Sequence, residues 1–300
     1  MTHSNALSAT VASPEGVQIH LLRARLELQK FAVASSVLAP AVKALRRIET
    51  SLARPLTIAI VGEFNSGKST LANLLVGMQS LPTSVMANTS IPTLITYAES
   101  AAVFAVYRDG RRTTISSHSD FQRKAILRLE VGLPVAGLRN FQFLDMPGLA
   151  DPRFGATVDD TLEHRPDALI WCTVASQAWK ASERSAWLMF PQQLRARSLL
   201  VATFADNLTD ATEQADVLDR LQKQAGHLFR EITIVATLDA QRFLELTQEE
   251  SETDPRHASG GPTILAEVDR LIDFTRRQRS ARAREMTARI ASHALELLPP

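Results

Sequence analysis

The sequence predicts an α/β fold, built on a doubly wound and mostly parallel sheet with helices on both faces. Two observations lead to this prediction. From about residue 56 to residue 240, short apolar runs typical of buried parallel strands alternate with longer amphipathic segments. In addition, a glycine-bearing loop joins the first apolar run to the first amphipathic segment.

The elements follow one another in a regular order. The expected strands cover residues 56–61, 91–97, 103–107, 113–116, 141–144, 167–174, 199–203 and 232–235. The expected helices cover residues 17–52, with an interruption or kink near Pro40, then 70–76, 120–131, 182–194, 212–229 and 263–298. Asp109-Gly110 is expected to form a hairpin turn between two of the strands.

Composition limits the class of protein. Charged residues make up 22% of the 300 residues and the net charge is +1, so nothing favours nucleic acid or anionic lipid overall. The only cysteine, Cys172, excludes an internal disulfide, suits a reducing cytoplasm and is expected to be inert core packing. We find neither a secretion signal at the N-terminus nor an apolar stretch long enough to span a bilayer.

The glycine-bearing loop, Gly62–Ser69, matches the phosphate-binding pattern G-x-x-x-x-G-K-[ST] at every fixed position. Because it connects a strand to a helix N-terminus, its backbone N–H groups and the helix dipole would point at one bound polyphosphate. Lys68 would reach the β- and γ-phosphates, and the Ser69 hydroxyl would hold Mg²⁺. The pattern predicts a P-loop NTPase. Its expected nucleotide-binding residues are Gly62, Glu63, Phe64, Asn65, Ser66, Gly67, Lys68, Ser69 and Thr70.

A second motif supplies further parts of a triphosphate site. The expected strand 141–144 ends in Asp145-Met146-Pro147-Gly148. An aspartate at the end of a core strand can support Mg²⁺, directly or through water. The N–H of Gly148 could meet the γ-phosphate, and a glycine there lets the segment rearrange after hydrolysis.

These motifs, with the stretch from Leu81-Pro82-Thr83 to Thr89-Ser90-Ile91-Pro92, resemble the GTPase domain of the dynamin superfamily. The similarity covers roughly residues 56–240 and is greatest to bacterial dynamin-like GTPases. The resemblance implies GTP as substrate and Mg²⁺ as cofactor. It also makes Thr89 the switch threonine, closing on Mg²⁺ and the γ-phosphate, with Thr93 as the rival candidate.

The base-reading motif departs from the family pattern, Thr/Asn-Lys-x-Asp. Here the strand 199–203 leads into Thr203-Phe204-Ala205-Asp206. Asp206 is retained, and a carboxylate that accepts two N–H bonds discriminates guanine from adenine. Phe204 replaces the lysine, and its ring either stacks on the base or turns into the core. Guanine is therefore the expected base, with an ATPase as the alternative. Residues 234–237 occupy the position of the family's last base-contacting loop.

Catalysis is a second departure. Eukaryotic dynamins carry a glutamine in the loop to position the attacking water, and this chain has Phe64 there and Leu149 after the second motif. We therefore expect slow intrinsic hydrolysis, accelerated when a second molecule or a partner completes the site. The alternative is a nucleotide-bound scaffold that hydrolyses poorly. Candidate donors to such a site are Arg111, Arg112 and Arg153, although solvated loop arginines are more common.

The resemblance also implies that helices before and after the GTPase domain pair into a short bundle. The expected organisation is a disordered N-terminus (1–15), a helical segment (16–53), the P-loop GTPase domain (54–250), a linker (251–262) and a C-terminal helix (263–300). In that last helix, two apolar faces are expected, one with Ile264, Val268, Leu271 and Ile272, and another with Met286, Ile290 and Leu297. The chain is expected to lack the long stalk and membrane-inserting element of remodelling dynamins.

The C-terminal helix is rich in arginine, at positions 276, 277, 279, 282, 284 and 289. A solvated helix face is the commonest meaning of such a run, contact with anionic lipid is a second, and RNA binding as in a ribosome-associated GTPase is a third. The expected partners are a second copy of the chain or another GTPase, and DNA is not among them. We expect a cytoplasmic protein, with peripheral contact at the inner face of the cell membrane as an option.

The tryptophans and histidines are not expected to take part in binding or catalysis. Trp179, Trp187 and Phe190 are expected to pack a helix against the sheet, and the seven histidines lack metal-ligand spacing.

Overall fold

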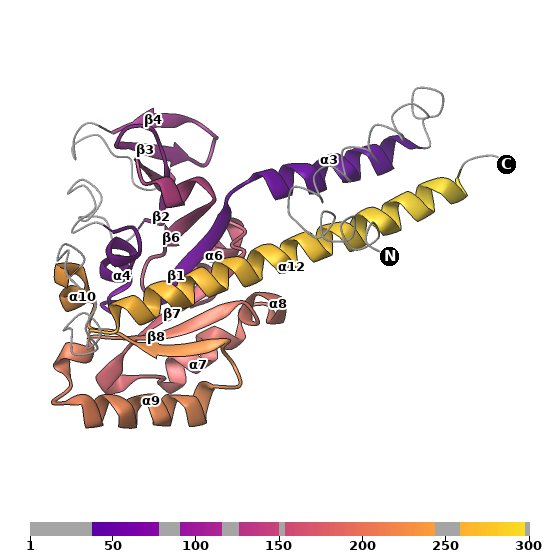
Figure 1. Ribbon diagram of the computed structural model, residues 1–300. Helices are drawn as coiled ribbons and strands as arrows, with labels where there is room; N and C mark the ends of the chain where they lie inside the picture. Colours follow the sequence, from indigo (N-terminus) through magenta and orange to yellow (C-terminus); the bar gives the residue numbers. More distant parts are fainter. Residues whose placement is uncertain (1–37, 78–90, 116–125, 150–153, 244–258, 298–300) are drawn as a thin grey trace, which may run out of the picture. The chain divides into compact units, whose positions relative to one another are not determined.

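The computed structural model describes residues 38–77, 91–115, 126–149, 154–243 and 259–297 (Figure 1). The chain divides into two compact units. One comprises residues 56–272 and contains the sheet, and the other combines residues 1–55 with residues 273–300.

The described residues of the first unit form one nine-stranded sheet, in the order β4-β3-β5-β2-β6-β1-β7-β8-β9. In this order the strands are β4 (Arg112–Thr114), β3 (Ala102–Tyr107), β5 (Ile126–Leu133), β2 (Thr93–Tyr97), β6 (Phe141–Asp145), β1 (Leu56–Gly62), β7 (Ala168–Val174), β8 (Ser198–Thr203) and β9 (Glu231–Ile234). The run from β6 to β9 is parallel throughout. Antiparallel pairing is confined to β2 with β6 and to β3 with its neighbours β4 and β5.

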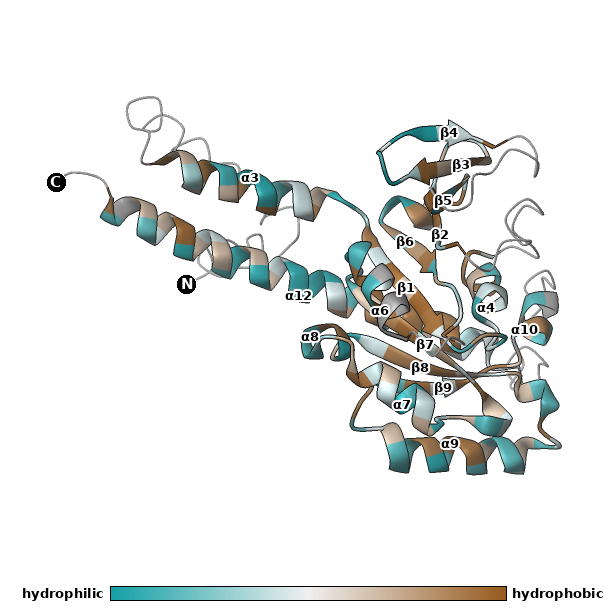
Figure 2. Cartoon of the chain, turned by 180° about the vertical axis from the view of Figure 1, so that it is seen from behind, coloured by the Kyte–Doolittle hydropathy of each residue, from teal (hydrophilic) through white to brown (hydrophobic). Residues whose placement is uncertain are grey.

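Helices cover both faces of the sheet. One face packs against α4 (Lys68–Leu75), α10 (Thr237–Phe243) and the beginning of α12 (Gly261–Glu296). The other packs against α6 (Phe154–Glu163), α7 (Ala181–Leu188), α8 (Gln192–Arg195) and α9 (Ala211–Ala225). In Figure 2 the central strands are brown, because their side chains are apolar on both faces. The predicted doubly wound, mostly parallel α/β fold is confirmed.

Strand β1 shows why this arrangement forms. All seven of its residues are buried. Ile58 and Ile60 point into the cluster on the α4 side, whereas Ala59 and Val61 point into the cluster on the α7 side. Side chains alternate between the two faces of a strand, so only a continuous apolar run can fill both layers at once.

One expected element is wrong. The sequence favoured a helix over 120–131, but residues 126–133 form β5, which pairs with β2 and β3. Within β5, Leu129 and Val131 are buried, whereas Arg128 and Glu130 lie on the opposite face and form an ion pair with each other at 2.6 Å. The alternation of side chains between the two faces of a strand therefore outweighs the helix propensity of the individual residues. The expectation for residues 120–125 lies outside the described part of the chain.

The second unit is built on an antiparallel contact between two helices. Helix α3 (Ala39–Ala53) begins with Pro40 in its first turn, where proline needs no N–H partner. The buried side chains of α3 pack against Ala283, Ile290 and Ala294 of α12. They are Val42, Leu45 and Ile48, joined by Leu38 just before the helix. Arg279 also donates to the carbonyl oxygen of Arg54 at 2.9 Å.

The two expected apolar faces of α12 have different outcomes. Ile264, Val268, Leu271 and Ile272 all join the core beneath the sheet, as predicted. Of the second set, Ile290 packs against α3, whereas the side chains of Met286 and Leu297 are exposed. None of the helices that the structure describes combines the length and the apolar character needed to cross a bilayer.

Candidate nucleotide-binding site

The loop between β1 and α4 has the shape of a phosphate cradle. Asn65 (φ 58°) and Gly67 (φ 77°) adopt left-handed conformations, which turn successive backbone N–H groups toward one side. The Lys68 ammonium donates to the carbonyl oxygen of Glu63 at 2.6 Å and so closes the loop across its mouth. A Cβ at Gly62 would lie 2.2 Å from the Cys172 carbonyl oxygen, so only glycine lets the loop leave β1 this close to β7.

The structure brings two of the three predicted Mg²⁺ residues, Ser69 and Asp145, together. The Ser69 hydroxyl donates to an Asp145 carboxylate oxygen at 2.5 Å. Ser69 lies in the first turn of α4, the helix that follows β1, and Asp145 is the last residue of the neighbouring strand β6, so the contact joins the start of this helix to the end of that strand. Burial raises the pKa of Asp145 to about 6, while the Ser69 hydrogen bond and the Lys68 charge act in the opposite direction. Burial also lowers the pKa of Lys68.

Two buried oxygens at this site lack hydrogen-bond partners among the described residues. They are Asp145 Oδ1 and the hydroxyl oxygen of Ser66. A buried polar atom without a partner costs free energy, and a ligand that provides the partner recovers it. Carboxylate and hydroxyl oxygens are the ligand type that Mg²⁺ prefers. The side chains of Ser69 and Asp145 therefore fit a hard divalent cation.

Gly148 lies where the phosphate loop and the end of β6 meet. Hydrogen bonds from Met146 N to Ile60 O (3.1 Å) and from Leu149 N to Gly62 O (3.0 Å) hold this segment beside β1. A Cβ on Gly148 would come within 2.5 Å of Phe64 Cα. The backbone at Gly148 therefore contacts the loop directly, in a space that no other residue type fits.

The end of β8 supports the same loop. The buried Thr203 hydroxyl lies within hydrogen-bond distance of the carbonyl oxygens of Ser66 (2.8 Å) and Thr173 (3.0 Å). Phe204 follows in a left-handed conformation and is half-buried. Its ring lies 3.3 Å from the Cβ position of Gly67, so it contacts the loop. Asp206 lies in the short helix η5 (Ala205–Asn207) and is exposed.

The other candidates lie elsewhere. Thr89 and Arg153 are outside the described residues. Thr93 is a buried residue of β2 whose hydroxyl donates to Ile91 O at 3.3 Å. Arg111 pairs with Asp109, and Arg112 pairs with Glu130 at 2.8 Å while its guanidinium covers the Phe104 ring.

The aromatic residues have the structural role predicted for them. Trp179, Trp187 and Phe190 all belong to the buried cluster on the α7 side of the sheet. The ring of Trp187 stacks on Phe229 with centroids 4.3 Å apart and meets Trp171 edge-on at 5.6 Å. Cys172 is buried in β7, and this burial raises the pKa of its thiol.

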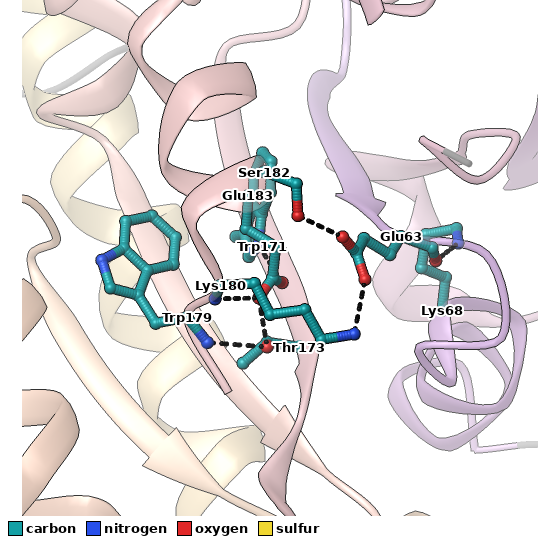
Figure 3. A network of polar contacts seen from close by, with 8 residues as sticks. All are labelled: Glu63, Lys68, Trp171, Thr173, Trp179, Lys180, Ser182 and Glu183. Carbon is teal, nitrogen blue, oxygen red and sulfur yellow. Dashed lines mark hydrogen bonds and ion pairs between the residues drawn. The ribbon is translucent and has the colours of Figure 1, made fainter. Parts of the chain in front are cut away.

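Sequence reasoning missed a polar network beside the loop (Figure 3). The Glu63 carboxylate accepts from the Lys180 ammonium at 3.0 Å and from the Ser182 hydroxyl at 2.7 Å. Behind them, the buried Glu183 accepts from Lys180 N, and also from Trp171 Nε1 and the Thr173 hydroxyl. The available signal was Lys180-Ala-Ser-Glu183, since an acid at the third helical position often caps the residue before the helix.

Taken together, the loop between the first strand and its helix, and the Asp145–Gly148 segment at the adjacent strand end, define a P-loop nucleotide-binding domain. Residues 58–204 match the Dynamin family. Dynamin-like protein 2 of Campylobacter jejuni is 30% identical over 205 residues, which are 66% of this chain and 33% of that protein. Isoniazid-induced protein IniC of Mycobacterium tuberculosis is 35% identical over 113 residues, covering 35% of this chain and 23% of its own length.

Solved structures agree on the fold. A chain of an oligomerised bacterial dynamin pair, described as a mechanism for long-range sensing and tethering of membranes, superposes with a TM-score of 0.58. The match has 20% identity and covers 81% of this chain and 38% of that one. This chain therefore carries a dynamin-superfamily GTPase domain, as its motifs predicted. It spans about a third of the length of the Campylobacter relative and of the solved dynamin chain.

Proposed function

We propose that the domain binds GTP with Mg²⁺ and hydrolyses it, and that nucleotide state controls contact with a second molecule. The observation that carries the proposal is that the side chains of Lys68, Ser69 and Asp145 come together at the phosphate loop. Lys68 closes the cradle, and the Ser69 hydroxyl at the start of α4 donates to the Asp145 carboxylate at the end of β6 at 2.5 Å. The domain's membership of a GTPase superfamily supports the same reaction class.

Each residue has a proposed role in that reaction. Lys68 and the loop N–H groups bind the β- and γ-phosphates, and Ser69 and Asp145 hold Mg²⁺, with Thr89 joining them when triphosphate is bound. The metal ion would supply positive charge to the phosphate oxygens. Gly148 offers its N–H to the γ-phosphate. Thr203 holds the loop in place through the Ser66 carbonyl oxygen.

Guanine is the proposed base, read by the Asp206 carboxylate. Phe204 contacts the loop next to Gly67, so its ring is available to cover the face of a bound purine in place of the family lysine. A purine stacked on a ring would not by itself distinguish guanine from adenine, which keeps an ATPase as the second candidate. Under this proposal the Asp206 carboxylate makes the distinction.

Calorimetric titration of the wild type and of Asp206→Asn with GTP, ATP and xanthosine triphosphate separates these two functions. We expect the wild type to prefer GTP over ATP, and Asp206→Asn to lose GTP affinity and gain affinity for the xanthosine nucleotide, whose base presents the complementary pattern. Tighter binding of ATP by the wild type would instead establish the adenine nucleotide, and equal binding would show that the site does not select between the two bases.

Hydrolysis is proposed to be slow for the isolated protein. Two positions could carry a side chain that orients the attacking water, one in the phosphate loop and one after Gly148. The first holds Phe64, which is apolar and 52% exposed, and the second holds Leu149, which is buried in the core. A turnover assay against Lys68→Ala decides whether this chain is an enzyme. Phosphate release above the level of Lys68→Ala supports the GTPase, and equal release supports a nucleotide-bound scaffold.

Contact with a second copy, with another GTPase or with an anionic membrane completes the proposal. The solved bacterial dynamins are described as an oligomerised pair that senses and tethers membranes, which makes such contacts reasonable for this domain. The basic part of α12 is the proposed lipid-facing element, although several of its arginines are engaged, as in the pairs Arg276–Asp273 (3.2 Å) and Arg289–Glu285 (2.6 Å).

A further inference from the structure

The phosphate loop, which is proposed to receive a polyanion, itself contains a carboxylate, that of Glu63. Glu63 is the second residue of the loop, and its side chain is 25% exposed. Two like charges repel, and at the edge of a protein this repulsion is stronger than in bulk water. A loop with an uncompensated Glu63 would therefore bind nucleoside triphosphate less tightly. The structure shows what compensates it.

Two groups from the start of α7 engage this carboxylate, one oxygen each (Figure 3). The Lys180 ammonium is 3.0 Å from Oε2, and the Ser182 hydroxyl is 2.7 Å from Oε1. We call this set of contacts the Glu63 clamp. With both oxygens occupied, the carboxylate is turned toward α7, and its charge is matched by a cation at hydrogen-bond distance.

The cation is presented by a rigid support. Lys180 N donates to the Glu183 carboxylate at 2.9 Å, and Glu183, 1% exposed, is anchored to β7 by Trp171 and Thr173. Trp179, the residue before Lys180, has a left-handed φ of 63° and donates its N–H to the Thr173 hydroxyl at 3.3 Å. A non-glycine residue keeps such a conformation only where its surroundings impose it. The backbone that carries Lys180 is thus held in place by the core.

The clamp also acts on the residue that orients the catalytic lysine. The carbonyl oxygen of Glu63 accepts from Lys68 at 2.6 Å, while its side chain is held by Lys180 and Ser182. Fixing the side chain of Glu63 therefore fixes the acceptor that places the Lys68 ammonium over the cradle.

We propose that Lys180 is a positioning residue for nucleotide binding, which neutralises the loop's own carboxylate and holds Glu63 so that the cradle can accept a triphosphate. The inference rests on the proposed function, since it concerns the same site. It assigns to Lys180 no contact with the nucleotide: the lysine acts through Glu63.

The electrostatic role predicts a particular pattern of coupling. Lys180→Met removes the ion-pair partner of the Glu63 carboxylate, so we expect the affinity for a fluorescent GTP analogue to fall about threefold to tenfold, a modest effect because the pair is partly exposed. Lys180→Met combined with Glu63→Gln removes the repulsion as well, and affinity should return to within about twofold of the wild type. Lys180→Arg keeps the charge and should bind normally.

Lys223→Met is the matched control, because Lys223 also forms a lysine–carboxylate ion pair, with Asp219 at 2.5 Å on the exposed side of α9. It should leave the affinity unchanged. In steady-state assays the loss in Lys180→Met should be in KM with kcat preserved, since the clamp affects bound substrate and transition state alike. A loss that is merely structural would lower the melting temperature of the ligand-free protein and would not be restored by Glu63→Gln.

The outcomes distinguish this inference from the proposed function. If the wild type binds no guanine nucleotide, both fail together. If the wild type binds and Lys180→Met binds equally well, only the inference is overturned. It is also overturned if the double variant is as weak as Lys180→Met or weaker, because the carboxylate is then not the source of the loss.

Discussion

Single residues determine how closely the two halves of the site approach each other. Gly148 and Phe64 are in contact through backbone atoms, with a Cβ at Gly148 placed 2.5 Å from Phe64 Cα and 2.7 Å from Phe64 N. Neither atom belongs to a side chain that could rotate away. Asp145 and Ser69 depend on this approach, because the segment that follows Asp145 is the one held against the loop.

Gly148→Ala should therefore damage the site more than an ordinary small-to-large change. We expect a loss of about 1–3 kcal/mol in unfolding free energy from overpacking, together with a reduced preference for GTP over GDP, because the loop must shift away from Gly148. Chemical denaturation and nucleotide titrations measure both. Gly137→Ala is the control, since a Cβ there would meet only the Phe141 ring at 3.4 Å. Equal behaviour of the two variants would refute the close approach.

Glu183 provides a prediction about pH. Burial raises the pKa of its carboxyl above the ordinary value of 4.5, and the hydrogen bonds from Lys180 N, Trp171 and Thr173 offset this only in part. The folded protein therefore binds the proton more tightly than the unfolded chain. The stability from this group is fully present below pH 4.5 and is lost as pH rises through the higher folded pKa.

Urea unfolding of wild type and Glu183→Gln between pH 4 and 8 tests this directly. The amide cannot ionise, so the difference in unfolding free energy between the proteins should move in favour of Glu183→Gln as pH rises. The absolute value of this difference also includes the effect of the amide's altered hydrogen bonds. The relevant quantity is therefore the slope of the difference in unfolding free energy against pH. A difference that stays flat across the range, or slopes in the opposite direction, would show that this carboxyl does not carry a raised pKa.

At the scale of elements, a helix or strand could be predicted from the sequence where neighbouring residues determine it, and could not where pairing with distant residues determines it. β1, the loop and α4 were predictable because one apolar run, two glycines and a helix start lie within twenty consecutive residues. β5 was not, because it is a strand only through pairing with β2 and β3. The Glu63 clamp was not either, since Glu63 and Lys180 lie far apart in the sequence and meet only through the β1–β7 pairing.

The contact between α3 and α12 can be tested separately from the nucleotide site. Leu45 is 1% exposed and packs in the cluster that holds α3 against the second half of α12. Leu45→Ala should destabilise this unit by about 2–5 kcal/mol. Hydrogen exchange should accelerate in residues 39–53 and 273–296, with nucleotide affinity unchanged. The exposed Lys43→Ala serves as the control, and unaltered exchange in Leu45→Ala would contradict the packing.

At the scale of the whole molecule, α12 belongs to both units. Its residues 261–272 pack beneath the sheet, and its residues from 273 onward form the unit with α3. A single helix thus leads from the nucleotide domain to the helical unit.

If a second copy completes the catalytic site, the rate of GTP hydrolysis depends on protein concentration. With Phe64 and Leu149 at the two positions considered for orienting water, hydrolysis per molecule should rise with protein concentration, because a second copy supplies the missing groups across the nucleotide. Phosphate release at saturating GTP, measured across a hundredfold range of protein, tests this, with Lys68→Ala as the background. A specific activity that stays constant while sedimentation shows self-association would exclude activation by a second copy and leave a different protein as the activating partner.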